Sequence, residues 1–271
     1  MQLHVRHVTR YTYTGPVVHG LNRLRIKPKS THGQQVRVWD MVLDGAVLET
    51  EYEDEHHNSV ALVSVEPGIR QLEIACTGTI ETSDNAGVIG HHAGHMPLWC
   101  FLRPTPLTMP GPTIRALASR FDRTSEDRVA LLHDLSTAVH GAISYETGRT
   151  HVQTSGEEAL VAAHGVCQDH THVFLSACRL LDIPARYVSG YLMMNDRIEQ
   201  DAGHAWAEAH VSGLGWVGFD ISNAISPDER YVRVATGCDY AEAAPVTGVL
   251  SGSNEATLHV ELAVAQQQIQ Q

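Results

Sequence analysis

The first third of the chain alternates apolar and polar residues with a period of two, as half-buried β-strands do. Four segments show this pattern, at residues 3–13, 36–43, 59–65 and 72–80. Turn-forming pairs follow three of them, at Gly15-Pro16, Asp44-Gly45 and Pro67-Gly68. Short strands at this spacing predict a small antiparallel β-sandwich.

A connector rich in Gly, Pro and His follows at residues 82–112, and the apolar period then becomes helical. Four helices are predicted, with starts near Pro112, Thr124, Glu157 and Cys167. Gly165 is expected to end the third helix, because glycine readily adopts the left-handed conformation found after many helices. Pro184 is expected to end the fourth.

The rest of the chain has the pattern of strands, at residues 185–193, 205–211, 216–221, 231–234 and 258–264. The glutamine-rich end, residues 266–271, is expected to be frayed. The whole pattern predicts an α+β protein. An antiparallel β-sandwich module occupies residues 1–81, a connector residues 82–112, and a core with C-terminal strands residues 113–271. In that core we expect the helix at Cys167 to pack on an antiparallel sheet.

Cys167 carries the first candidate chemistry, because it opens a helix two residues after Gly165. The free N–H groups and the positive end of a helix dipole stabilise a thiolate at such a position. The same N–H groups can hold the negative oxygen that forms when a thiolate attacks a carbonyl. A buried structural cysteine is the alternative, and Cys178 on the same helix fits that alternative.

His204 begins a strand whose two faces differ in character. The even positions carry His204, Trp206, Glu208 and His210, whereas the odd positions carry alanines and then Val211. The small apolar face is predicted to pack on a helix, and the polar face to line a wet substrate cleft that includes Trp206. A histidine there can deprotonate a thiol and later protonate a leaving amine. A solvated surface histidine is the alternative, since the chain has 18 histidines.

Asp220 closes the next strand and offers a carboxylate to that histidine. A hairpin centred on Ser212 would place His204 directly opposite Asp220, and Trp206 opposite Gly218. Residues that face each other in this way have Cβ atoms about 4.5–5.5 Å apart. Asp220 could then hold the imidazole and stabilise its charged form. The alternative is that Asp220 only caps the strand end.

Other polar residues were weighed for supporting roles. Asp169 and His172 are i, i+3 neighbours on the helix and could hydrogen-bond each other, so we expect them to orient the helix or contact substrate. The histidine clusters His91-His92, His95 and His56-His57 lack the ligand spacing of a zinc site. They are interpreted as a His-rich connector, and no metal site is predicted.

Composition narrows the class of protein. The net charge of −12 argues against a nucleic-acid binder and against docking on an anionic membrane. The chain shows no apolar signal segment and no stretch fit to span a bilayer. Five cysteines without paired spacing suit a reducing compartment, so the expected location is the cytoplasm.

Several stretches resemble the transglutaminase-like superfamily, in particular its bacterial branch of transglutaminase-like cysteine proteases. Within roughly residues 143–223 they are ISYETGRTHVQTSGEEAL, HGVCQDHTHVFLSACRLLDIPARYVSGYL and GHAWAEAHVSGLGWVGFD. Upstream, HVTRYTYTGPV, LNRLRIKP and DEHHNSV resemble the β module that precedes the core in this branch. Two details differ from the common pattern. Asp220 is followed by Ile221-Ser222 rather than Pro-Thr, and His170 replaces a frequent aromatic residue.

The resemblance implies a papain-like transglutaminase core in which Cys167 is the nucleophile, His204 the base and Asp220 the third member. We predict cleavage of a peptide, protein or small amide through a thioester, without a metal or an organic cofactor. The N–H of Cys167 is expected to be one oxyanion donor, and Tyr145 is a candidate for the second. The alternatives are an acyltransferase that passes the acyl group to an amine, and a catalytically silent peptide-binding protein.

Overall fold

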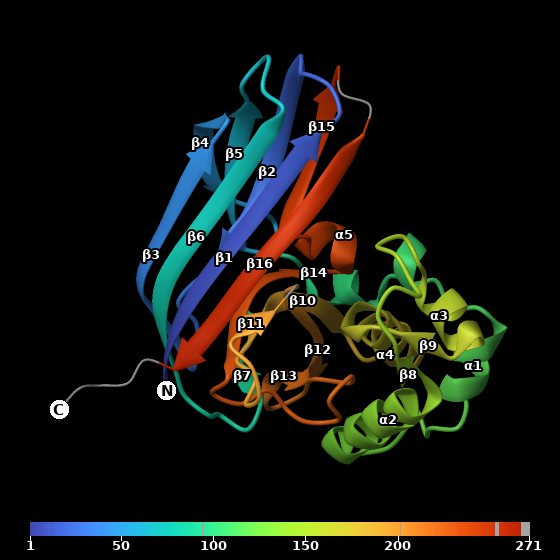
Figure 1. The fold of residues 1–271 in the computed structure, drawn as a ribbon. Coiled ribbons are helices and arrows are strands. Elements are labelled where there is room, and N and C mark those ends of the chain that lie inside the picture. Colours follow the sequence, from blue (N-terminus) through green and yellow to red (C-terminus); the bar gives the residue numbers. More distant parts are fainter. Residues whose placement is uncertain (94, 201, 253–254, 267–271) are drawn as a thin grey trace.

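The computed structural model describes residues 1–93, 95–200, 202–252 and 255–266, and places a long β-sandwich module beside an α+β core (Figure 1). The first sheet of the module has the strand order β11 (Glu199–Gln200), β16 (Ala256–Gln266), β1 (Gln2–Tyr13), β6 (Gln71–Thr82) and β3 (Gln34–Asp44). The second has the order β15 (Val246–Ser251), β2 (His19–Lys27), β5 (Ser59–Val65) and β4 (Ala46–Glu53). Leu24 and Val63 of the second sheet share a buried cluster with Leu72 and Ile74 of the first. The α+β class and the predicted sandwich are therefore confirmed.

Four strands in the two sheets of the module were not predicted. They are the short β11, β15, and the pair β2 and β4. The inward positions of β2 include Gly20 and Asn22, which hide the apolar period of a strand. In β4 only Ala46 is buried and the remaining residues are exposed, because β4 lies at the edge of its sheet. Neither strand carries the alternation that marks a half-buried segment.

The two C-terminal strands return to the N-terminal sheets, so that red strands lie beside blue ones in Figure 1. Leu262 and Val264 of β16 face His7 and Val5 of β1, and β15 pairs with β2. Both strands lie within the predicted core, residues 113–271, and not within the predicted module. An alternating pattern predicts a strand but does not say which strand it pairs with. The domain limits at residues 81 and 112 stay a prediction.

The core is built on a five-stranded sheet with helices on one face. Its strand order is β14 (Tyr231–Gly237), β10 (Ala185–Leu192), β12 (His204–Val211), β13 (Gly215–Phe219) and β7 (Val88–Gly90). The helices are α1 (Pro112–Ala118), α2 (Arg128–Ala142), α3 (Gly156–Ala162), α4 (Cys167–Leu180) and the short α5 (Tyr240–Ala243). The alanines on the odd positions of β12 share the core cluster with Val173 and Phe174 of α4. The predicted packing of a helix on this apolar face is confirmed.

The connector supplies more structure than its composition suggested. It contains β7, which forms the edge of the core sheet, and two 3-10 helices, η1 (Leu98–Leu102) and η2 (Pro106–Thr108). Two short parallel strands, β8 (Ser144–Tyr145) and β9 (His164–Gly165), lie beside the start of α4.

The predicted fraying of residues 266–271 falls, beyond Gln266, outside the described residues. None of the helices in the described ranges is both long and apolar enough to cross a membrane.

The end of α3 differs from its prediction. Ser155 caps the helix as expected, because its hydroxyl accepts from the N–H of Glu158. The left-handed residue after the helix is Ala163, with a φ of 55°, and not Gly165. Gly165 is needed for another reason. A Cβ at this position would lie 2.7 Å from the Cβ of Asp169, so only glycine allows this side chain to approach the chain before α4.

Module and core share a second apolar cluster. Leu3 and Val5 of β1 and Ile80 of β6 pack with Tyr191 of β10 and Val232 of β14. One face of the first sheet is therefore covered at one end by the second sheet and at the other end by the core. The two parts are joined by a common buried interior.

The C-terminal strand should be necessary for stability. Leu262 is 3% exposed, whereas Leu258 on the same strand is 54% exposed. Leu262→Ala is expected to lower the free energy of unfolding by about 2–5 kcal/mol, because it leaves a cavity where module and core meet. Leu258→Ala, the matched control, should change it by no more than about 0.5 kcal/mol. Urea denaturation measures both, and equal effects would contradict this packing.

Candidate active site

Cys167 is the first residue of α4 and lines a cavity of about 420 Å³. Its side chain is partly buried, at the edge of the core cluster. At the helix start the N–H groups of Val166 and Asp169 bond within the segment. The N–H of Cys167, as the first helical residue, has no intrahelical partner and can reach a bound group. The predicted helix start at Cys167 is confirmed, and the thiol reaches a space that a substrate can enter.

Three of the other cysteines are buried and have unreactive thiols. Burial raises the pKa of Cys76 to about 12. Burial, with a smaller effect from Glu242, raises the pKa of Cys238 to about 12 as well. The pKa of Cys178, which is fully buried, is also raised by its burial. A protonated thiol is a poor nucleophile, so these three cysteines are poor candidates for the attacking group.

His204 stands at the start of β12 and lines the same cavity as Cys167. Its Nε2 lies 2.6 Å from Oδ2 of Asp220, and both side chains are buried. Nδ1 is thereby the ring nitrogen left for the cavity, and Cys167 lies close enough to help raise the pKa of the imidazole. Sulfur, imidazole and carboxylate come together from a helix and two neighbouring strands.

The register that brings His204 to Asp220 differs from the predicted one. Glu208 pairs with Gly218, not with Trp216, and Val211 pairs with Gly215, so the hairpin is centred on Gly213. Gly213 and Gly215 both have positive φ angles, which lets a three-residue turn connect the strands. The change moves each partner by two positions, so Asp220 keeps the predicted face of the sheet. It contacts His204 diagonally and not from directly opposite.

The two charges stabilise each other. Burial alone would lower the pKa of His204, but the hydrogen bonds and negative charges of Asp220 and Cys167 raise it to about 10. Burial alone would raise the pKa of Asp220, but the hydrogen bond and charge of His204, with other donors, lower it to about 2. The imidazolium and the carboxylate are therefore the stable forms around neutral pH.

Three residues that the sequence did not point to complete the hydrogen bonding of Asp220. Oδ2 also accepts from Tyr231 Oη at 2.7 Å and from Asn223 Nδ2 at 2.8 Å. Oδ1 accepts from Ser222 Oγ at 2.9 Å and from the N–H of Asn223 at 3.2 Å. Ser222 and Asn223 follow Asp220 directly, so a polar turn after the aspartate was a usable signal. Tyr231 opens β14, and no local pattern pointed to it.

The predicted supporting pair is not formed. Asp169 turns back to the start of its helix, where Oδ2 accepts from the N–H of Val166 at 2.8 Å and from Thr150 Oγ1 at 2.7 Å. His172 faces the other way, and its Nε2 accepts from the N–H of Tyr240 at 3.2 Å. Burial and the charge of Arg179 lower the pKa of His172 to about 3, so this ring is neutral. Both residues position main chain near the cavity and do not contact each other.

Trp206 does not line the cavity that holds Cys167. It is 2% exposed and packs between the rings of His204 and Tyr231, at 6.2 and 5.4 Å between centroids. Glu208 is fully buried as well. The middle of the even face of β12 is therefore covered and not wet, because Tyr231 and Arg233 of β14 contact Trp206 and Glu208. Sequence reasoning could not see this cover, since it comes from distant segments.

Tyr145 and His170 form an aromatic pair near the helix start. Tyr145 is 55% exposed and stacks on the ring of His170. Burial of its hydroxyl, together with the nearby charges of Cys167 and Asp220, raises the pKa of Tyr145 to about 12. The phenol keeps its proton and can donate. His170, which replaces a frequent aromatic residue, is buried, with both ring nitrogens near the main-chain oxygens of Val166 and Ile143.

The module supplies one wall of the cavity. His7, Thr9 and Tyr11 of β1 and Leu258 and Val260 of β16 face Cys167 and His204 across it. Among the described residues that line the cavity, none is Asp, Glu, Lys or Arg. Burial lowers the pKa of His7 to about 4, so this ring adds no charge at neutral pH. The cavity offers apolar surface and neutral hydrogen-bonding groups.

The histidine clusters have separate surroundings. His92 accepts from Trp216 Nε1 through Nδ1 at 3.1 Å, and its Nε2 lies 2.7 Å from the main-chain oxygen of Met96. His92 is thus held as a structural residue. His57 contacts Glu53, whereas His56 contacts Glu242 of α5.

Comparison with known proteins is consistent with this geometry. The chain is 28% identical to an uncharacterized protein of Mycobacterium leprae over 287 residues, which covers 96% of each chain. It is 27% identical to an uncharacterized protein of Mycobacterium tuberculosis, covering 93% of this chain and 88% of the relative. A crystal structure from Cytophaga hutchinsonii, provisionally described as a cysteine protease, matches the fold with a TM-score of 0.77. The identity is 21%, and the match covers 100% of this chain and 92% of that one.

Two family models match separate parts of the chain. Residues 3–81 match the bacterial transglutaminase-like N-terminal region, and residues 115–221 match the transglutaminase-like superfamily core. The matched core contains Cys167, His204 and Asp220. The chain therefore belongs to the transglutaminase-like superfamily and carries the N-terminal region of its bacterial members.

Proposed function

We propose that this protein is a cysteine-dependent enzyme that cleaves a peptide or amide bond through a thioester on Cys167. The observation that carries the proposal is the buried 2.6 Å contact of His204 with Asp220, with both His204 and Cys167 on one cavity. A raised imidazolium pKa beside a thiol at a helix start favours the thiolate–imidazolium pair.

The proposed reaction has two steps. The Cys167 thiolate attacks the carbonyl carbon, a C–S bond forms, and the carbonyl electron pair moves onto oxygen. The C–N bond then breaks, and the proton on Nδ1 of His204 passes to the leaving amine. In the second step His204 takes a proton from water, the new C–O bond forms, and the thiolate leaves. Asp220 stays ionised throughout and holds the ring.

The oxyanion of the first step needs donors near the sulfur. The N–H of Cys167, at the start of α4, supplies one by its place in the helix. Tyr145 is the proposed second donor. Its hydroxyl keeps its proton, and it lies close enough to Cys167 for the charge of that residue to raise the pKa of the phenol. The alternative acceptor in the second step is a primary amine, which would make the enzyme a transferase.

The acyl group of the substrate is proposed to be uncharged. The described lining residues carry no carboxylate, ammonium or guanidinium group, and a charge placed there would lose its hydration without gaining a partner. The tyrosines of the wall suit an apolar or aromatic side chain with some polar character. The wall supplied by the module would thus contact the acyl group.

Labelling by an electrophilic acyl probe tests the nucleophile. Cys167→Ala is expected to abolish both labelling and probe hydrolysis, a loss of roughly 10³-fold or more. Cys178→Ala, on the same helix but buried, is the control and should label like the wild type. Mass spectrometry of the labelled peptide and a rate assay measure these outcomes. Added primary amine that becomes incorporated in the product would support the transferase alternative. Labelling that persists in Cys167→Ala would exclude this nucleophile.

Asp220→Asn should lower the pKa of His204. The ring stays buried but loses the anion that favours its charged form, so the pKa should fall from about 10 by about 1–3 pH units. Since the protonated ring must deliver the proton to the leaving amine, the alkaline limb of the rate profile should move to lower pH. Imidazole resonances followed by NMR titration measure the pKa directly. An unchanged titration in Asp220→Asn would contradict the coupling.

Leu258→Arg should change acyl selectivity. Leu258 lines the cavity from β16 and is 54% exposed, so an arginine can be accommodated there. The wild type should prefer a neutral aromatic acyl probe over a glutamyl one, and Leu258→Arg should reduce that preference at least about tenfold, an effect of about 1.4 kcal/mol. Val249→Arg, on exposed β15 outside the cavity, is the control. Equal effects of both arginines on the rates would argue against contact between the module wall and the acyl group.

A further inference from the structure

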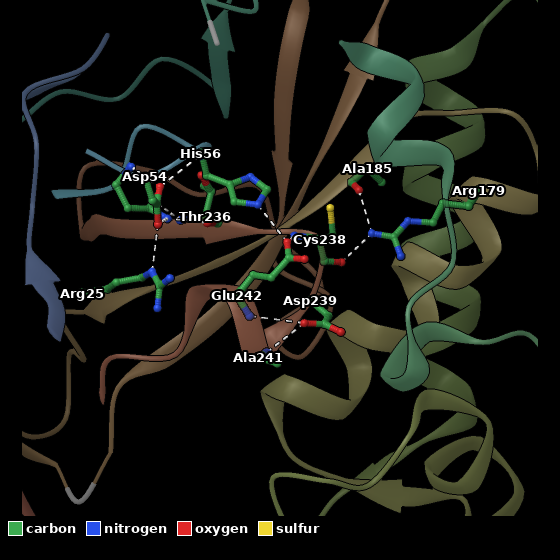
Figure 2. A network of polar contacts seen from close by, with 11 residues as sticks. Arg25, Asp54, His56, Arg179, Ala185, Thr236, Cys238, Asp239, Ala241 and Glu242 are labelled. Carbon is green, nitrogen blue, oxygen red and sulfur yellow. Dashed lines mark hydrogen bonds and ion pairs between the residues drawn. The ribbon is translucent and has the colours of Figure 1, made fainter. Parts of the chain in front are cut away.

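Three metal-ligating side chains meet where the module joins the core, away from Cys167 (Figure 2). They are His56 from the loop between β4 and β5, Cys238 directly after β14, and Glu242 from α5. One donor atom of each lies within 4.8 Å of the others. We propose that these residues bind a divalent transition-metal ion of the zinc class.

The donor set suits such an ion. Zn²⁺ takes sulfur at about 2.3 Å and imidazole nitrogen or carboxylate oxygen at about 2.0–2.2 Å, usually in a tetrahedron. Cys238 is protonated in the free protein, so binding of the ion would release its proton to solvent. The resulting thiolate and the carboxylate together carry two negative charges, which balance the charge of the ion. With three protein ligands, water completes the fourth position. The soft sulfur also disfavours Mg²⁺ and Ca²⁺, which prefer oxygen alone.

The loop that carries His56 is fixed in place before any ion arrives. Asp54 Oδ1 accepts from the N–H groups of His56 and Asn58 at 3.0 and 2.9 Å, and Asp54 Oδ2 accepts from Arg25 at 2.9 Å. Asn58 then pairs with both main-chain groups of Thr236, at 2.7 and 2.8 Å. The loop of the module is thereby attached to β14, two residues before Cys238, as Figure 2 shows in part.

The core supplies the other two ligands from an equally ordered segment. Arg179 donates to the main-chain oxygen of Cys238 and to that of Ala185. Asp239 caps α5 by accepting from the N–H of Ala241 at 2.8 Å, which sets the first turn that carries Glu242. Side chains held by their own backbone anchors need little reorganisation to bind an ion.

The ring of His56 uses only part of its hydrogen-bonding capacity in contacts with other described residues. It is 2% exposed, and its Nε2 lies 2.8 Å from Oε2 of Glu242. Its Nδ1 is buried and has no hydrogen-bond partner within the described residues. Glu242 Oε2 also accepts from the N–H of Cys238 at 2.7 Å. The His56 ring and the main chain of Cys238 therefore already meet at one carboxylate oxygen of Glu242, and a metal ion would replace the contact between ring and carboxylate.

An ion at this position would join the module to a wall of the catalytic cavity. His56 belongs to the module, whereas Glu242 lies two residues after Tyr240, which lines the cavity. The N–H of Tyr240 also donates to His172 of α4. Loss of the ion would loosen α5 and, through it, this wall.

Cobalt titration tests the site. The Cys100→Ala/Cys167→Ala protein, which lacks both partly exposed thiols, should bind one Co²⁺ per chain and show a thiolate-to-cobalt absorption band in the near ultraviolet. Cys238→Ser in that background should lose the band. His56→Ala and Glu242→Gln should each weaken binding at least about tenfold. His57→Ala, one residue along the same loop, is the matched control and should bind like its parent.

Thermal unfolding gives a second readout. Added Zn²⁺ should raise the melting temperature of the parent protein, because a ligand that binds only the folded state stabilises it. The increase should disappear in His56→Ala, a variant that remains informative if Cys238→Ser does not fold. Absence of a thiolate band in the parent, or a band and a melting shift that persist in His56→Ala, would overturn the proposal.

Discussion

The contact between Asp220 and His204 constrains the whole arrangement around the cavity. A carboxylate with no solvent exposure is stable only if its hydrogen-bonding capacity is met. Asp220 meets it with His204, Tyr231 and the turn that follows it. Because these donors come from separate strands and a turn, the carboxylate fixes their relative positions. The imidazole is thereby held with its second nitrogen toward the thiol.

The junction of module and core depends on a second buried acid. Glu208, fully buried, accepts from Arg186 at 2.6 Å and from Arg233 at 2.7 Å. The side-chain amide of Gln34 in β3 donates to the main-chain oxygen of Arg233 and accepts from the N–H of Arg233. Removal of one partner would leave an uncompensated charge inside the protein. The module is therefore coupled to the core by polar contacts as well as by the apolar cluster around Leu3 and Tyr191.

Local patterns predicted the elements that position the proposed chemistry. The helix opening at Cys167 and the alanine face of β12 were both visible, because helical and strand periods place side chains on defined faces. The face of Asp220 was also correct, since a shift by two residues leaves the face unchanged. The register itself was wrong because a pair of glycines with positive φ selects a turn that spacing alone does not specify. The i, i+3 pairing of Asp169 with His172 failed for a similar reason, because capping of the helix start competed for the carboxylate.

By itself the sequence determined helices α1 to α4 and the strands with an apolar alternation, because these follow from local periods and caps. It also determined which residue opens α4 and which side chains share a face of β12. Only the tertiary structure decided that β16 lies beside β1, that Trp206 is covered, and that His56 meets Cys238 and Glu242. Each of these depends on contacts between segments far apart in the chain. Their free energies come from burial and from hydrogen bonds that no local pattern encodes.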